Sequence, residues 1–104
     1  MKFNEYQDIA LSFRLKSADE QYAILNLAGE VGELMSHEAK MIRDGGNYLT
    51  HLENIKKELG DILWCVSAIA RDNGFDLDEV AQGNIDKLTR RKANNTIKGS
   101  GDDR

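Results

Sequence analysis

The sequence predicts an all-α fold, a bundle of four helices. Proline is absent from the 104 residues, and β-branched residues never alternate with polar ones over the length of a strand, so the periodic segments are predicted to be helices. Four short polar side chains are each followed three residues later by Glu or Gln, an arrangement that satisfies free amide groups at the start of a helix. These pairs are Asn4 with Gln7, Ser17 with Glu20, Thr50 with Glu53, and Asp76 with Glu79.

The four helices are expected to begin near these caps. We expect the second to run from about residue 18 to 44, where Gly45 and Gly46 supply a stop, and the third from about 51 to 73, where Gly74 does the same. The last stretch has too little apolar content to pack by itself. The sequence therefore predicts one helical domain over residues 1–92 and a flexible tail over residues 93–104.

Composition excludes several classes of partner. The formal net charge is only −4 although 31% of the residues are charged, so the chain lacks the basic footprint that grips a nucleic-acid polymer. Uncharged runs such as residues 62–70 are too short to cross a bilayer. The single cysteine, Cys65, cannot form an internal disulfide, which fits a reducing compartment. We expect a cytoplasmic protein without a membrane partner.

Two pairs of acids stand at matching places in the predicted second and third helices. Glu30 and Glu33 form one pair, and Glu58 and Asp61 the other. At this spacing the two acids of each pair are neighbours on one helix face. Their mutual repulsion destabilises a solvated helix by ~0.2–0.5 kcal/mol, so another interaction is expected to offset it. No Lys or Arg stands three or four residues from the first three acids, and only Asp61 has one, Lys57.

The segment after Asp61 is apolar on nearly all sides, as in a helix that is buried on most faces. A carboxylate there must be neutralised, hydrogen-bonded or bound to a cation. Four carboxylates on two helices offer only hard oxygen ligands, which suit magnesium or manganese rather than zinc. Spacing alone is equally consistent with solvated acidic faces.

This layout of four acids resembles the signature of the MazG-like nucleotide pyrophosphohydrolases, all-α enzymes related to dimeric dUTPases and to phosphoribosyl-ATP pyrophosphohydrolase. The similarity extends to Glu5-Tyr6-Gln7 near the start and to Leu77-Asp78-Glu79-Val80-Ala81 in the closing helix, followed by Asn84, Lys87, Leu88 and Arg91. It thus covers most of the chain.

The resemblance implies a magnesium-dependent enzyme, with manganese as a possible substitute, that cleaves a nucleoside triphosphate to a monophosphate and pyrophosphate. It implies that Glu30, Glu33, Glu58 and Asp61 are the metal ligands and the catalytic acids. It also implies that phosphates or sugar are contacted by Asn84, Lys87 and Arg91, and that the MazG-like bundle is completed in a homodimer or homotetramer.

Other interpretations stay open at this point. Lys87 and Arg91 near a helix end also complement the helix dipole, and Trp64 fits a core or an interface better than a base-stacking role. His37, one turn after Glu33, fits a surface better than the role of a ligand neighbour or base contact. Residues 99–104 read as a disordered end, or as a glycine-rich segment that closes over phosphates. The alternative activities are those of the two related enzymes, and the alternative class is a non-catalytic helical interaction module.

Overall fold

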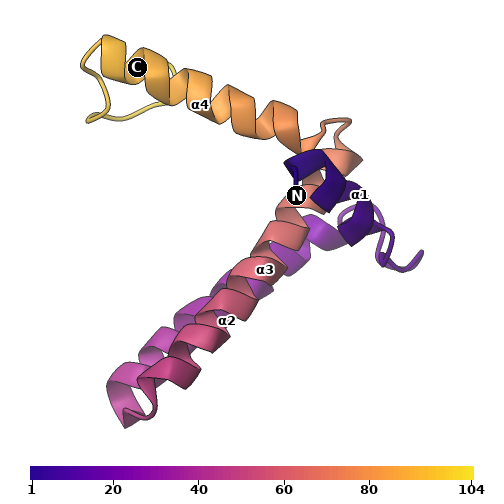
Figure 1. Cartoon of the computed structure of the whole chain (residues 1–104), viewed down its shortest axis with the longest axis vertical. Helices are drawn as coiled ribbons and strands as arrows, with labels where there is room; N and C mark the ends of the chain where they lie inside the picture. The colour runs from indigo at the N-terminus through magenta and orange to yellow at the C-terminus, as the bar shows by residue number, and fades with distance from the viewer.

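Four α-helices and no strands make up the chain in a computed structural model that describes all residues from 1 to 104. They are α1 (Phe3–Leu11), α2 (Tyr22–Asp44), α3 (Tyr48–Asp72) and α4 (Leu77–Ala93). The two long helices α2 and α3 lie side by side as an antiparallel hairpin, α1 packs on the later half of α3, and α4 projects away from the hairpin (Figure 1). The all-α, four-helix prediction is confirmed.

The reversals after α2 and α3 occur where glycine was expected to stop the helices. Gly45 caps α2 with a φ of +70°. Gly74 follows α3 with a φ of +81°, and the Phe75 amide donates back to the Ala70 carbonyl at 2.8 Å. This pair of features is a Schellman turn, in which a left-handed residue lets the chain satisfy the last carbonyls of a helix.

Three of the four expected caps are wrong, and each has a physical reason. Asp76 caps α4 as predicted, because its side chain accepts from the Glu79 amide at 2.9 Å. Helix α3 begins earlier than predicted because Asn47, rather than Thr50, is its cap. Helix α2 begins later than predicted, at Tyr22 rather than near Ser17, since Glu20 adopts a φ of +54° that no helix can contain.

The expected cap pair of α1 instead serves the start of α4. Asn4 and Gln7 both lie inside α1, where the Asn4 Oδ1 accepts from the Asp78 amide at 2.9 Å and the Gln7 Oε1 accepts from the Leu77 amide at 3.1 Å. Gln7 is almost fully buried, and its Nε2 donates to the Ser67 and Phe75 carbonyls. These bonds fix α1 and the start of α4 to the end of α3.

The small buried core leaves much apolar surface uncovered. The buried apolar residues are Ala10, Ala23, Cys65, Ala68, Ala70 and Leu77. Larger side chains such as Leu59 and Met35 are 52% and 66% exposed on the hairpin. No helix in the structure has the length and apolar character needed to cross a membrane.

Candidate metal centre

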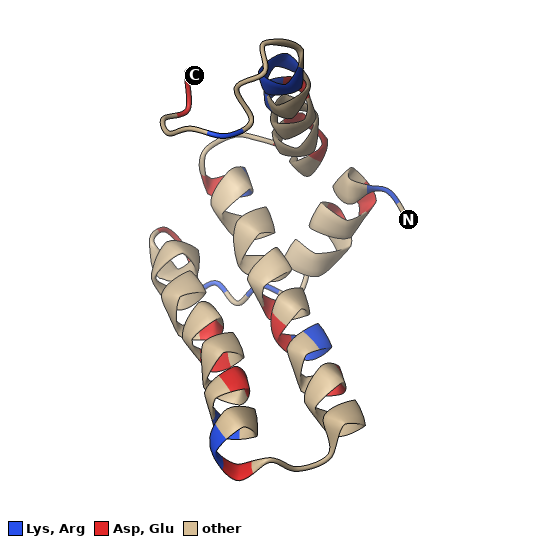
Figure 2. Ribbon diagram, turned by 90° about the vertical axis from the view of Figure 1, so that its left-hand side faces the viewer, with Lys and Arg blue, Asp and Glu red and all other residues tan.

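A stripe of polar residues lines the seam between α2 and α3. On α2 the stripe contains Asn26, Glu30, Glu33 and His37, spaced four, three and four residues apart, so all four share one face. On α3 the facing stripe contains His51, Asn54, Glu58, Asp61 and Cys65. Acidic residues of both helices occur in the middle of the hairpin in Figure 2. The sequence-predicted acids are therefore carried by the two helices that pack against each other.

Three of the four predicted acids form one cluster. Glu30, Glu33 and Glu58 each offer a carboxylate oxygen, and these three atoms lie within 4.8 Å of one another. Glu58 is buried, Glu30 is half-buried and Glu33 is exposed. Two antiparallel helices thus bring together acids that are 25 residues apart or more in the sequence.

Asp61 lies beside this cluster rather than inside it. Its side chain is exposed in the single chain, whereas the sequence argument expected it to be partly buried. The reason is the rotation of α3, which turns Glu58 toward α2 and leaves Asp61 one turn further along at the edge of the seam. Burial, and then the charges of Asp61, Glu33 and Glu58, raise the pKa of Glu30. Asp61 is therefore close enough to act on the same site.

The cluster fits a divalent cation. Glu30 Oε2 and Glu58 Oε2 are both buried and have no hydrogen-bond partner. A buried carboxylate oxygen without a partner costs free energy unless a proton or a cation meets it, and the raised pKa of Glu30 has the same origin. An all-oxygen set of this kind suits magnesium or manganese.

Two polar side chains besides the four predicted acids lie within hydrogen-bond reach of the cluster. The Asn26 amide lies 3.5 Å from Glu30 Oε1 and 3.6 Å from Cys65 Sγ. His37 Nε2 lies 3.3 Å from Glu58 Oε1, so His37 is a neighbour of the acids rather than the surface histidine that the sequence favoured. The signal in the sequence was the spacing of these residues from the acids, which places them on the same stripe.

Comparison with known protein families shows to which family this chain is related. The family model of the MazG nucleotide pyrophosphohydrolase domain matches residues 18–96. The chain belongs to this family. The Gene 37 protein of Mycobacterium phage L5 is similar to this MazG domain, with 36% identity over 85 residues that cover 80% of the chain and 75% of the phage protein. No solved structure matches the chain.

A hollow adjoins the acids of the MazG domain at the connection between α1 and α2. Its volume is about 240 Å³, and both Glu30 and Asp61 contribute to its wall. The rest of the wall is aromatic, apolar and polar, from Phe13, Arg14, Leu15, Ala18, Tyr22, Asn26 and Trp64. Trp64 is half-buried and its indole N–H donates to the Ala10 carbonyl at 3.0 Å, so one edge of the ring is fixed by α1.

The connection that covers this hollow is anchored by Arg14. Its guanidinium forms two hydrogen bonds with the Asp72 carboxylate, at 2.8 and 3.0 Å, which tie residues 12–21 to the end of α3. The bond to Asp72 is the main cause that raises the pKa of Arg14. A two-pronged contact of this kind holds a loop more firmly than a single ion pair does.

The three predicted phosphate or sugar contacts lie elsewhere in the same chain. Lys87 and Arg91 point to one carboxylate, that of Asp102, at 3.4 and 3.5 Å, and Asn84 is exposed one turn earlier. Helix α4 contacts α1 and α3 but not α2, and Figure 2 shows its cluster of Lys and Arg apart from the acids of the hairpin. One chain alone does not bring these cations to its own acidic cluster.

Proposed function

We propose that this MazG domain hydrolyses nucleoside triphosphates to a monophosphate and pyrophosphate with the help of Mg²⁺ or Mn²⁺ held by Glu30, Glu33, Glu58 and Asp61. The observation that carries the proposal is the pair of buried, unpartnered oxygens of Glu30 and Glu58 within a three-carboxylate cluster. Water would add across the bond between the α- and β-phosphates, and one proton would be released. When bound, the cation supplies positive charge against phosphate oxygens and acidifies a water.

The protein side chains around the acids have positioning roles in this proposal. Asn26 steadies Glu30, and His37 steadies Glu58, so that the free oxygen of each acid stays directed into the seam. Side chains that hold metal ligands in place commonly change metal affinity when they are removed. A carboxylate oxygen of the cluster would accept the proton released by water.

The hollow beside the acids is the proposed place of the nucleoside. It combines the flat apolar surfaces of Phe13, Tyr22 and Trp64 with the amide of Asn26, and small-molecule sites typically pair an apolar wall with a few polar groups that fix orientation. Because Glu30 and Asp61 form one side of this hollow, a base placed there would have its phosphates at the acids.

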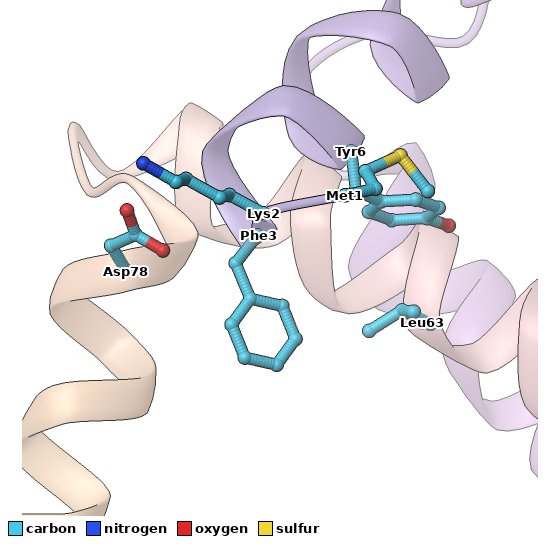
Figure 3. A pocket seen from close by; sticks show the side chains of 6 residues that line it. All are labelled: Met1, Lys2, Phe3, Tyr6, Leu63 and Asp78. Carbon is cyan, nitrogen blue, oxygen red and sulfur yellow. The ribbon is translucent and has the colours of Figure 1, made fainter.

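A second copy of the chain is the proposed partner, in a homodimer or homotetramer. On the outer face of α3, Leu52 and Leu59 are 44% and 52% exposed at a spacing of seven residues, and Ile24, Val31, Met35 and Ile42 form a similar exposed row on α2. Exposed apolar rows of this length mark interfaces. The hollow of about 380 Å³ between Phe3, Tyr6 and Leu63 (Figure 3) adds to this apolar surface. A second copy would also supply Asn84, Lys87 and Arg91 to the acids.

The test is a panel of canonical, deoxy and modified nucleoside triphosphates incubated with and without Mg²⁺. We expect pyrophosphate and a monophosphate to appear from at least one member of the panel, and only when the cation is present. Release of orthophosphate and a diphosphate would contradict the mechanism. If Mg²⁺ neither raises the melting temperature nor supports turnover, the chain is a helical interaction module instead.

A further inference from the structure

The hollow beside the acids is enclosed by three different parts of the chain. Two of its lining residues come from α3, three come from α2, and four come from residues 12–21, which connect α1 to α2. Helix α1 itself contacts α3 and α4 but not α2. The width of the hollow therefore depends on how residues 12–21 are held against α3.

A single side chain, Arg14, holds this connection against another helix. Its Nη1 and Nη2 donate to the two carboxylate oxygens of Asp72, and its Nε donates to the Ala18 carbonyl. The other hydrogen bonds of residues 12–21 reach no further than four residues along the chain. One guanidinium thus fastens two points of the connection to the end of α3. We call the Arg14–Asp72 pair the clasp.

The clasp is better shielded from water than the other ion pair at this end of α3. The side chains of Arg14 and Asp72 are 12% and 23% exposed, whereas those of Arg71 and Asp8, which join α3 to α1, are 48% and 75% exposed. Breaking a shielded, two-pronged pair costs more than breaking a solvated one, because the remaining charge loses its partner away from water. The Arg71–Asp8 pair is therefore a natural control for the clasp.

The two residues on either side of Arg14 turn apolar surface toward the hollow. Phe13 and Leu15 both line it, yet they are 78% and 70% exposed. A molecule bound in the hollow would cover part of this surface, and burial of apolar surface favours binding. Because Arg14 stands between the two residues in the sequence, its bonds to Asp72 fix where both side chains lie.

The clasp lies well away from the acidic cluster. Asp72 comes eleven positions after Asp61, which places it on the same side of α3 and about 16 Å further along the helix axis. Arg14 therefore closes the hollow at the end remote from the acids. A change at the clasp is expected to alter the outer wall of the hollow without moving the metal ligands.

We propose that Arg14 is a positioning residue for the nucleoside part of the substrate, and that it acts through Asp72 rather than by touching the substrate. The clasp keeps the connection closed over α3, so that Phe13 and Leu15 pack against the bound nucleoside. This contact is made equally before and during the reaction, so its loss raises KM and leaves kcat unchanged. The inference rests on the proposed function, because it takes the hollow as the place of the nucleoside.

The experiment compares the parent with Arg14→Gln, Asp72→Asn and the variant that carries both changes. The substrate is the nucleoside triphosphate that the parent cleaves fastest, at saturating Mg²⁺ and below the melting temperature of every variant. We expect each single change to raise KM about five- to tenfold and to leave kcat within about twofold. The double variant should be no worse than either single variant, because both changes break the same contact. Arg71→Gln, which breaks the exposed pair, should leave KM unchanged.

Acrylamide quenching of Trp64 fluorescence reports on the clasp without any substrate. Trp64 is the only tryptophan of the chain, and it is half-buried in the wall of the hollow. If the clasp holds the connection over α3, its loss lets the quencher reach the indole. We expect Arg14→Gln and Asp72→Asn to raise the quenching constant above the values of the parent and of Arg71→Gln.

Unchanged quenching in both single variants would overturn the proposal, whether or not the chain is an enzyme. A higher KM for Arg14→Gln but not for Asp72→Asn would also overturn it, because Arg14 would then touch the substrate itself. So would a fall in kcat at constant KM. A parent that cleaves no triphosphate would refute the proposed function and, with it, the role of Arg14 in substrate binding, while increased quenching would still show that the clasp closes the hollow.

Discussion

His37 Nε2 lies 3.3 Å from Oε1 of Glu58, across the seam between α2 and α3. This contact uses one oxygen of the carboxylate and leaves the other, Oε2, buried and without a partner. The neutral ring with its proton on Nε2, or the imidazolium, donates to Glu58. His37 thus contacts the one buried acid of the cluster, Glu58, while the second oxygen of that acid remains available to a cation.

His37→Ala is therefore expected to weaken the response to Mg²⁺. We expect the Mg²⁺ concentration that gives half-maximal pyrophosphate release to rise about tenfold, at the lower end of the effects seen when a residue that holds a metal ligand is removed. His51→Ala is the matched control, because the only acid that His51 contacts is Glu38, at 3.0 Å near the end of the hairpin, and Glu38 is not one of the four acids of the site. Equal effects of the two substitutions would contradict a special role of His37.

Substitutions of Glu58 and Asp61 are expected to affect the stability of the protein differently but its activity in the same way. In EDTA, Glu58→Gln should melt at the same temperature as the parent or higher, since it removes a buried charge from beside Glu30, whereas Asp61→Asn should change the melting temperature little because Asp61 is exposed. Both should lower turnover by at least about a hundredfold through lost metal binding.

Added Mg²⁺ should then raise the melting temperature of the parent more than that of either variant, because a ligand stabilises the state that binds it. Glu53→Gln, an exposed acid on the same helix, is the control and should leave stability and turnover unchanged. Normal turnover by Asp61→Asn would show that Asp61 is not part of the metal site.

Periodicity and the glycine stops predicted the helical class and the ends of α2 and α3, because these features are local. Helix starts were predicted less well, because the packing of the helices decides which polar side chain caps a helix, and the sequence does not show that packing. Asn4 and Gln7 form a plausible local cap pair, yet their side chains bond amides of Asp78 and Leu77 more than 60 residues away. The tertiary contact wins because it satisfies two amides in the first turn of α4, which have no acceptor within their own helix.

The acids of the candidate site were recognised from their spacing, but their relative burial was not. Asp61 stands three positions after Glu58, which places the two side chains about 60° apart around the helix, so a small rotation of α3 decides which of the two faces α2. Packing of whole helices sets that rotation. For the same reason the separation of Lys87 and Arg91 from the acids could not be seen in the sequence, which gives no angle between α3 and α4.

Gln7→Leu is expected to destabilise the fold strongly. The Gln7 amide is 1% exposed and bonds the Ser67 carbonyl, the Phe75 carbonyl and the Leu77 amide. Leucine would leave these buried groups without partners, so we expect a loss of about 2–4 kcal/mol in the free energy of unfolding. Urea denaturation measures it, with the exposed Gln82→Leu as the control. Similar midpoints for both variants would show that the Gln7 bonds contribute little.

The raised pKa of Glu30 predicts a pH dependence of stability in EDTA. Glu30 binds its proton more tightly in the folded chain than its ordinary value of 4.5 allows, so its contribution is fully present below that pH and is lost as pH rises through the folded pKa. We expect the melting temperature to fall as the pH rises above 4.5 and through the raised pKa of Glu30. Asp44 and Asp102 have pKa values lowered from 3.8, so their protonation changes stability only at lower pH, outside the range in which Glu30 titrates. Scanning calorimetry should show a smaller fall for Glu30→Gln, and an equal fall in both proteins would contradict the assignment.

The proposed homo-oligomer predicts that a charge on the outer face of α3 separates the subunits. Leu59 is half-exposed in the single chain, so Leu59→Lys removes little from the core, but at an interface it would place a charge among apolar side chains, which is costly. We expect the parent to sediment as a dimer or tetramer at micromolar concentration and Leu59→Lys to sediment as a monomer that keeps its helical circular dichroism. Lys57→Gln changes the charge of the same helix away from this row and should leave the assembly intact. A parent that sediments as a monomer would contradict the proposal, and it would leave Lys87 and Arg91 with no route to the acids, because α4 does not contact α2 in one chain.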